Sequence, residues 1–378
     1  MSSEPIPTPP IQRPRASTPW LIDRRFWLGI AISVACLYLA FRNVRWAELV
    51  VALRAVNWPI LALAALTIVV DTVLRSLRWR GLLTPVGTVS TSDAFDFLNI
   101  GVLANSVLPL RAGEFIRAIL LGEKRDLSKS AVFATVVVER VFDVLMLVIL
   151  AVVLMAAMPL HPAVKRTVLI FGIAGVVMMV LFWWASGSLA TNETTWLSTR
   201  ANRLIAWFAG PPDQPSQHET REKIASLLRR VWGMVQSFGS GLGVLRSPRL
   251  TADATVFTIL AWGAALLYIW LVLRACGLNL PWTAALMVLV IVNFGAAIPS
   301  SPGGLGVVHV LALLALTPWN VPRSQALSFA IMVHAVLFLV GILLGLLSLW
   351  RQGMGLGQLT RAGDQGTVEL VDGSPSVG

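Results

Sequence analysis

Residues 98–117 read LNIGVLANSVLPLRAGEFIR, and residues 293–309 read NFGAAIPSSPGGLGVVH. Both are apolar runs interrupted by a Pro-x-x-x-Gly pattern, which begins at Pro109 in the first and at Pro302 in the second. Irregular backbone survives at membrane depth only inside protein or beside a wet cavity, and paired broken helices are typical of transporters. The two segments therefore predict a transport-like site built from two interrupted helices.

Composition places these segments in a membrane protein. Hydrophobic residues make up 56% of the 378-residue chain and charged residues only 13%, whereas soluble domains carry about 25% charged residues. A spanning helix needs roughly 20 apolar residues, and the runs that qualify are about 26–44, 58–80, 131–157, 166–187, 251–276 and 326–350. The stretches 93–122 and 282–317 are split by their breaks into pieces too short to span singly. We predict an all-α, polytopic transmembrane helix bundle with two inverted re-entrant hairpins.

Basic residues set the predicted orientation. Arginines precede the first span and recur throughout 188–250, and such residues collect in cytoplasmic loops. The first hairpin then enters from the cytoplasm and the second from outside, although two independent kinked helices would also explain the breaks. Because loops account for most of the net charge of +11, we expect no nucleic-acid partner.

Three regions are expected along the chain. A Pro-rich cytoplasmic tail covers residues 1–25, a transmembrane domain 26–350, and a disordered tail 351–378. Within 188–250, a helix from Glu219 places apolar residues opposite basic ones. This amphipathic helix suits either the surface of an anionic membrane or packing against the floor of the bundle.

Charged residues inside spans are costly in hydrocarbon and mark functional sites by default. Thr135, Glu139 and Asp143 recur at every fourth residue and share one helix face, with Arg140 about 100° away. Asp71 lies at a similar predicted depth in the second span. The alternative explanation is a buried ion-pair network that merely ties the hairpin to the helix.

The first hairpin adds an arginine beside a broken helix, and the planar arginine fork binds phosphate bidentately. Gly113 is expected to free the backbone for a tight turn. Within the outer half only His309 and His334 are ionisable, and His334 is expected to be a core residue. The predicted substrate-binding residues are Asn105, Arg111, Glu114, Arg117, Glu139, Arg140, Asp143, Asp71 and His309, with backbone breaks at Pro109, Gly113, Pro302, Gly303, Gly304 and Gly306.

Three motifs in order carry a family resemblance. They are Asn105-x-x-x-Pro109-x-Arg111-x-Gly113-Glu114-x-x-Arg117, then Glu139-Arg140-x-x-Asp143, then Pro302-Gly303-Gly304-Leu305-Gly306. Together they resemble the transmembrane region of lysylphosphatidylglycerol synthases, the flippase-like domain family. Members commonly carry an acidic residue shortly after the last motif, where this chain has His309. The resemblance implies a free-standing, lipid-translocating protein without the aminoacyltransferase domain.

The expected function is that of a multi-pass lipid translocase in a bacterial inner membrane, which binds a lipid phosphate headgroup in a polar cavity. The lipid is a phospholipid, a polyprenyl-phosphate or a hopanoid-type lipid. No P-loop motif, metal-ligand set or catalytic group is identified, and no cofactor is expected. The alternatives are a membrane-embedded transferase acting on a lipid-linked substrate, and a non-transporting partner of a lipid-modifying enzyme.

Overall fold

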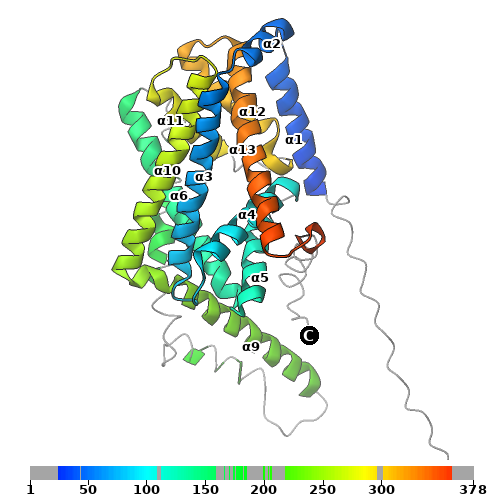
Figure 1. Ribbon diagram of the computed structural model, residues 1–378. Helices are drawn as coiled ribbons and strands as arrows, with labels where there is room; N and C mark the ends of the chain where they lie inside the picture. The colour runs from blue at the N-terminus through cyan, green and yellow to red at the C-terminus, as the bar shows by residue number, and fades with distance from the viewer. Residues whose placement is uncertain are drawn as a thin grey trace, which may run out of the picture.

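The computed structural model describes residues 24–42, 44–108, 112–158, 218–295 and 301–359, with scattered residues between 166 and 206. Its regular secondary structure within these ranges is helical. The described stretches that are long and apolar enough to cross a membrane are α3 (Trp58–Leu83), α6 (Lys129–Ala157), α10 (Pro248–Ala275), Pro302–Trp319 and α13 (Arg323–Arg351). Figure 1 shows the long helices running side by side. The predicted all-α transmembrane bundle is confirmed.

Two of the predicted spans are not found as single, fully described helices. Helix α1 (Arg24–Phe41) occupies the first, and α2 (Trp46–Arg54) follows it after an 89° bend. The two reach the length of a span only when they are counted together. The predicted span at 166–187 falls partly outside the described residues.

The first broken segment forms helices α4 (Thr91–Val107) and α5 (Gly113–Arg125), which pack against each other. Ser90 begins α4 by accepting a hydrogen bond from the backbone N–H of Asp93. Across the break, the backbone N–H of Gly113 donates to Asn105 Oδ1 at 2.9 Å. The predicted break residue Pro109 lies outside the described residues.

Gly113 serves close packing. It is the first residue of α5, and its φ is not positive, so it does not supply the left-handed conformation that makes glycine useful in a tight turn. A Cβ at this position would fall 1.9 Å from the carbonyl oxygen of Gly101 on α4. The absence of a side chain lets the two helices approach at the break.

The second broken segment forms α11 (Trp282–Gly295), a short turn η4 (Pro302–Gly304), α12 (Val307–Leu316) and a turn η5 (Thr317–Trp319). Gly303, Gly304 and Gly306 have φ values of 73°, 70° and 84°, a region that only glycine adopts freely. The predicted backbone break here is confirmed. Because η4 and η5 extend α12, Pro302–Trp319 passes as one span-length piece, so the expectation of short pieces holds only for α11.

The two broken segments lie toward opposite ends of the bundle. At one end the backbone N–H of Asn57, before α3, donates to Ala275 O at the end of α10. At the other end Arg351, which ends α13, contacts Asp96 in the second turn of α4 at 3.4 Å. Figure 1 shows α4 and α5 in the lower half and α11 and α12 in the upper half. Re-entry of each pair through one membrane face stays a prediction.

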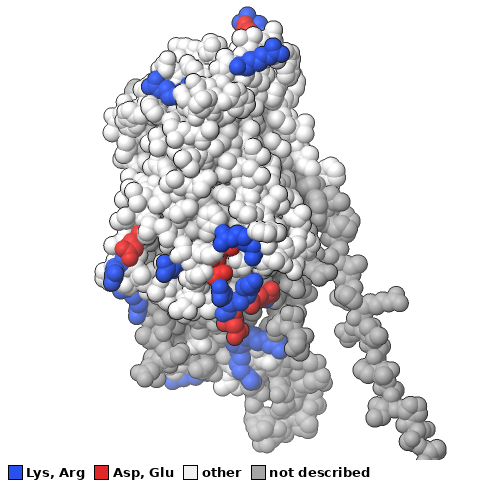
Figure 2. Space-filling model, viewed as in Figure 1, with Lys and Arg blue, Asp and Glu red and all other residues white. Residues whose placement is uncertain are grey.

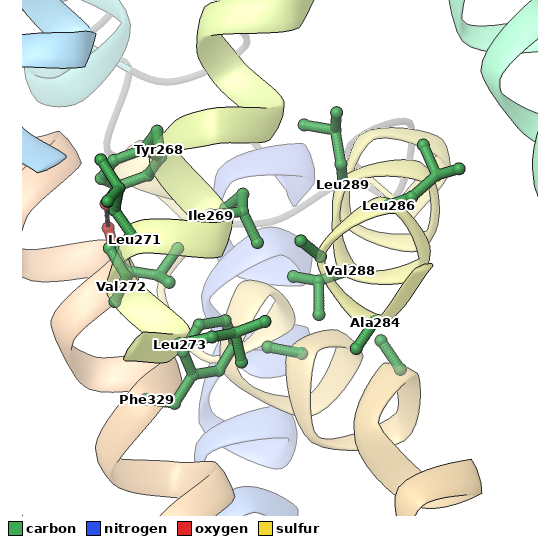
Figure 3. Packing of buried hydrophobic residues seen from close by; sticks show 14 of the residues in the cluster. Tyr268, Ile269, Leu271, Val272, Leu273, Ala284, Leu286, Val288, Leu289 and Phe329 are labelled. Atoms are coloured by element: carbon green, nitrogen blue, oxygen red, sulfur yellow. Dashed lines mark hydrogen bonds between the residues drawn. The ribbon is translucent and has the colours of Figure 1, made fainter. Parts of the chain in front are cut away.

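Two apolar cores follow this division. The upper core joins α10, α11, α12 and α13, and Figure 3 shows Ile269, Leu273, Val288 and Phe329 within it. The lower core packs α4 and α5 against α6 around Trp79, Phe97 and Ile116, among others. Figure 2 shows charged side chains over the lower part and at the upper rim, with a mostly uncharged band between them. A band of this kind is expected of a surface that faces lipid.

The predicted amphipathic helix is α9 (His218–Gly241). It packs on α6, where Ser130 Oγ donates to Met234 O at 2.8 Å. Several apolar side chains of α9 are nevertheless exposed, at Ile224, Leu227, Val231, Met234 and Val235, whereas Leu228, Trp232 and Phe238 are partly buried. The helix therefore lies at the floor of the bundle without turning its whole apolar face into it.

The chain after α13 stays folded further than predicted. Gln352 Nε2 donates to Asp96 Oδ2 at 2.7 Å, and Leu359 is only 3% exposed. The folded region thus extends beyond residue 351 to Leu359, and residues 360–378 lie outside the described residues.

Asp93 lies in the first turn of α4. Burial raises the pKa of the Asp93 carboxyl, but hydrogen bonds from Ser90 and Arg125 bring it below its ordinary value.

We predict that Gly113→Ala lowers the free energy of unfolding of the detergent-solubilised protein by about 1–3 kcal/mol, and with it the melting temperature. The reason is that the added Cβ meets backbone that has no room to move. Gly263→Ala on α10 is the matched control, since a Cβ there meets nothing within 4 Å. The control should be neutral or stabilising. Equal melting temperatures for the two variants would contradict the close approach of α4 and α5.

We predict that α9 and the turn after η5 lie on opposite sides of the membrane. In a chain with Cys36 and Cys276 replaced by alanine, Asn320→Cys should react with an impermeant thiol reagent in intact cells. Arg246→Cys, placed just after α9, should react only once the membrane is permeabilised. The reverse labelling pattern would contradict the orientation inferred from basic residues.

Candidate functional site

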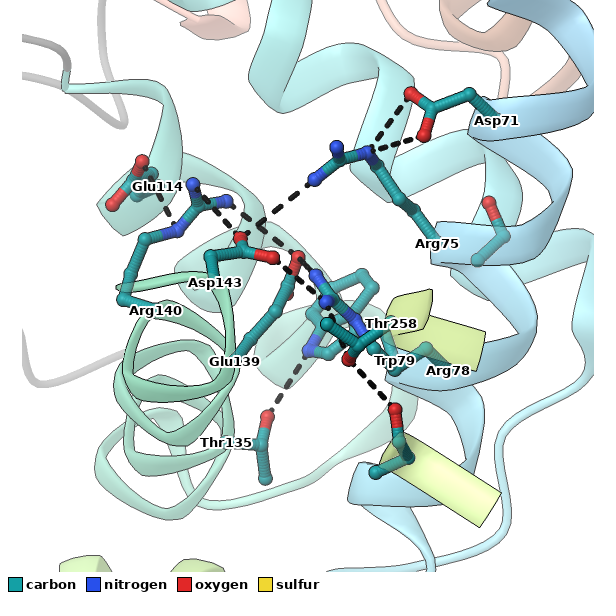
Figure 4. Close-up of polar contacts among 12 residues, drawn as sticks. Asp71, Arg75, Arg78, Trp79, Glu114, Thr135, Glu139, Arg140, Asp143 and Thr258 are labelled. Atoms are coloured by element: carbon teal, nitrogen blue, oxygen red, sulfur yellow. Dashed lines mark hydrogen bonds and ion pairs between the residues drawn. The ribbon is translucent and has the colours of Figure 1, made fainter. Parts of the chain in front are cut away.

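A row of polar side chains on α6 forms the centre of the site. Thr135, Glu139 and Asp143 are all buried, and they meet side chains of α3, α5 and α10 (Figure 4). Thr135 Oγ1 accepts a hydrogen bond from Trp79 Nε1 at 3.0 Å. The predicted common face of these three residues is confirmed.

The innermost layer consists of ion pairs between two arginines and two carboxylates, which together we call the inner tie. The Arg78 side chain, 0% exposed, places Nη2 2.8 Å from Glu139 Oε1 and Nη1 2.8 Å from Asp143 Oδ1. Arg117 on α5 places Nη2 2.8 Å from Glu139 Oε2, and its guanidinium lies 4.6 Å from the centre of the Trp79 ring. The carboxylate of Glu139 therefore joins α3 and α5 to α6.

A second layer lies at the open edge of this tie. The Arg140 side chain is 46% exposed and approaches Asp143 at 3.4 Å and both Glu139 and Glu114 at 3.5 Å. Arg75 holds Asp71 at 2.9 Å and lies 3.7 Å from Asp143 Oδ2. That oxygen has no hydrogen-bond partner, so two guanidinium groups converge on it at more than hydrogen-bond distance (Figure 4).

An apolar cavity adjoins the network. It has a volume of about 640 Å³ and lies between α6 and α10, with residues 179, 180 and 183 also lining it. Thr258 lines the cavity and also accepts a hydrogen bond from Arg78 Nη1 at 3.0 Å. Phe142, next to Asp143 in the chain, lines it as well. The charged network and the apolar cavity are therefore adjacent, and Thr258 contacts both.

The structure groups most of the predicted site residues. Asp71, Glu114, Arg117, Glu139, Arg140 and Asp143 lie in one network. Asn105 instead accepts a hydrogen bond from the backbone of α5. His309, in the second broken segment, stacks on His334 of α13. Arg111 lies outside the described residues.

Sequence reasoning placed Asp71 of α3 in the site but missed Arg75 and Arg78 on the same helix. Arg78 lies near the end of a predicted span, where a long side chain would be expected to reach the interface. A signal was present, because Asp71, Arg75 and Arg78 follow one another at four and three residues and so share a helix face. Trp262, whose Nε1 donates to Asp143 Oδ1 at 3.2 Å, left no such signal.

Comparison with known proteins assigns the family. The family model described as the lysylphosphatidylglycerol synthase TM region matches residues 26–345. The chain belongs to this family. The match covers every helix of the network and both broken segments, so the lysylphosphatidylglycerol synthase TM region contains the whole candidate site.

Curated relatives of this family member come from archaea. Glycosyltransferase AglD of Haloferax volcanii is 27% identical over 334 residues, which are 82% of this chain and 51% of AglD. The chain thus spans about half the length of that relative. A UPF0104 membrane protein of Methanothermobacter thermautotrophicus is 23% identical over 91% of this chain and 97% of its own length. UPF0104 membrane protein PH1989 of Pyrococcus horikoshii is 23% identical over 75% of this chain and 84% of its own length. No solved structure matches the chain significantly.

These comparisons support a multi-pass membrane protein of the lysylphosphatidylglycerol synthase TM region family. The expected bacterial inner membrane stays a prediction.

We predict that Glu139→Gln strongly destabilises the protein, by about 3–5 kcal/mol, since it leaves the buried guanidinium groups of Arg78 and Arg117 without their shared carboxylate. Arg140→Gln should cost no more than about 1 kcal/mol, because its side chain is 46% exposed and its ion pairs are long. Thermal unfolding in detergent measures both. Similar losses would show that the two layers are not distinct.

Proposed function

We propose that the protein moves a lipid between membrane leaflets by taking up its phosphate-bearing headgroup at the open edge of the network. The observation that carries this proposal is the convergence of Arg75 and Arg140 on Asp143 beside an apolar cavity. Guanidinium groups suit phosphate oxygens, and the apolar wall suits acyl chains.

The contact lengths support exchange at the edge. Charge-assisted hydrogen bonds are about 2.7–2.9 Å long, as the inner contacts of Arg78 and Arg117 are. The contacts of Arg140, at 3.4–3.5 Å, are longer and face an accessible surface. A phosphate oxygen therefore replaces weak contacts at Arg140 while the inner tie stays closed.

Charge balance limits what the edge accepts. The described network contains four arginines and four carboxylates, namely Arg75, Arg78, Arg117, Arg140, Asp71, Glu114, Glu139 and Asp143. An added anion must therefore compete with carboxylates that already contact each guanidinium. A singly charged phosphodiester fits this balance better than a highly charged nucleotide, because like charges nearby are repelled.

Two alternatives remain with this proposal. A membrane-embedded transferase draws support from the name of AglD, although the match covers only 51% of that protein. A non-transporting partner of a lipid-modifying enzyme would use the floor helix α9 as its docking surface. All three roles place a membrane lipid beside the network, whether a phospholipid, a polyprenyl-phosphate or a hopanoid-type lipid.

We predict that the protein, reconstituted in liposomes, makes a fluorescent phosphatidylglycerol accessible to a membrane-impermeant quencher, and that Arg140→Gln slows this movement at least about tenfold. The loss of one charge-assisted contact to phosphate corresponds to such a change. Arg246→Gln, an exposed arginine outside the network, should leave the rate unchanged.

The same liposomes test the alternatives. Equal rates for the unaltered protein and the Arg140→Gln variant would contradict the proposed headgroup site. A covalently altered lipid recovered without any redistribution would instead establish the transferase.

A further inference from the structure

The second broken segment holds buried polar atoms that the charged network does not use. His309 on α12, 6% exposed, stacks on His334 of α13 with ring centroids 5.2 Å apart. Among the described residues, His309 Nδ1, His334 Nε2 and Ser301 Oγ have no hydrogen-bond partner. Buried polar atoms are bonded in the great majority of cases, so these three atoms require a polar partner, either water or a ligand.

The start of α12 adds further unpaired donors. The first N–H groups of a helix have no partner within it, and Gly306 at this N-terminus offers no side-chain cap. The first break differs, because Asn105 Oδ1 accepts from the N–H of Gly113 there. The start of α12 thus has no side-chain cap among the described residues, although Gly306 itself packs on α1, where a Cβ would fall 2.4 Å from Ser33 O. The positive end of a helix dipole favours an anion.

The two stacked histidines lie near the second break. Helical side chains lean toward the helix N-terminus, so His309, the third residue of α12, lies beside the break. His334 also stacks on Phe338, and a Cβ at Gly303 would fall 3.0 Å from the Phe338 ring. The described helices α11 and α12 and the turn η4 contain no Asp, Glu, Lys or Arg. The site carries no charged side chain on these elements, and each neutral imidazole can donate from one of its two nitrogens.

We propose that the second break is an oxyanion site, which binds a phosphate group through His309, His334, Ser301 and the N-terminus of α12. The lipid source of that phosphate rests on the proposed function, whereas the chemistry of the site rests on the unpartnered donors alone. A site of neutral donors holds phosphate less tightly than arginines do. It therefore suits a second, more easily released station for the headgroup in the half of the bundle opposite Arg140.

Histidine resonances offer a direct test, since the chain has only four histidines. With ¹⁵N-histidine label in detergent, the imidazole signals of His309 and His334 should shift on addition of a short-chain phosphatidic acid. A short-chain diacylglycerol, which has the same chains without phosphate, should leave them unchanged. Inorganic phosphate is the third probe: a shift with it assigns a general phosphate site, and its absence beside a phosphatidic acid shift assigns a lipid phosphate site.

Two substitutions separate hydrogen bonding from packing. His309→Phe keeps the ring stack but removes both nitrogens, and should weaken phosphatidic acid binding, followed at His334, at least about tenfold. His309→Asn loses the ring but retains a donor near the position of Nδ1, and should bind better than the Phe variant. Binding that survives in the Phe variant and is lost in the Asn variant would overturn the site, as would no shift with either phosphate probe or an equal shift with diacylglycerol.

The Arg140→Gln variant distinguishes this site from the proposed function. If the histidine signals still respond in that variant while lipid movement is lost, both proposals stand. If lipid movement is unaffected by Arg140→Gln but the histidines respond, the headgroup site at the network fails and the oxyanion site survives. If the histidines of the unaltered protein do not respond while Arg140→Gln abolishes movement, the oxyanion site alone fails.

Discussion

The tie of Glu139 to Arg78 and Arg117 is the interaction on which the lower half of the bundle depends. Charges in a medium of low dielectric constant must be paired and hydrogen-bonded, because desolvation otherwise outweighs any gain. The side chains of Arg78 and Glu139 are 0% and 1% exposed, so neither can turn to water. This requirement fixes α3 and α5 against α6, and it thereby fixes the position of the first break.

The two breaks share a sequence pattern but differ in how their backbone N–H groups are hydrogen-bonded. At the first, Asn105 bonds to the N–H of Gly113, and the helices meet so closely that Gly101 and Gly113 lack room for side chains. At the second, glycines at positive φ turn the chain and leave the start of α12 uncapped. The first break is consequently closed by protein groups, whereas the second retains unsatisfied donors.

Sequence reasoning succeeded where a periodic pattern met a strong physical penalty. The polar face of α6 formed by Thr135, Glu139 and Asp143 cannot face lipid, and the network there follows from that rule. It failed where position in a span gave the wrong guidance, as at Arg78, and where geometry across helices was needed, as for Trp262. Gly113 shows a third kind of error, since close approach and turn formation both favour glycine and the sequence does not separate them.

The polar network divides into two layers of different geometry. The inner contacts are short and shielded, and removing any partner leaves a buried charge. The outer contacts of Arg140 are long and accessible, so exchanging one for a phosphate leaves no charge stranded. Because Glu139 and Asp143 contact arginines of both layers, the fold and the exchangeable edge share the same two carboxylates. The inner arginines therefore hold these carboxylates in place independently of the contacts that Arg140 makes.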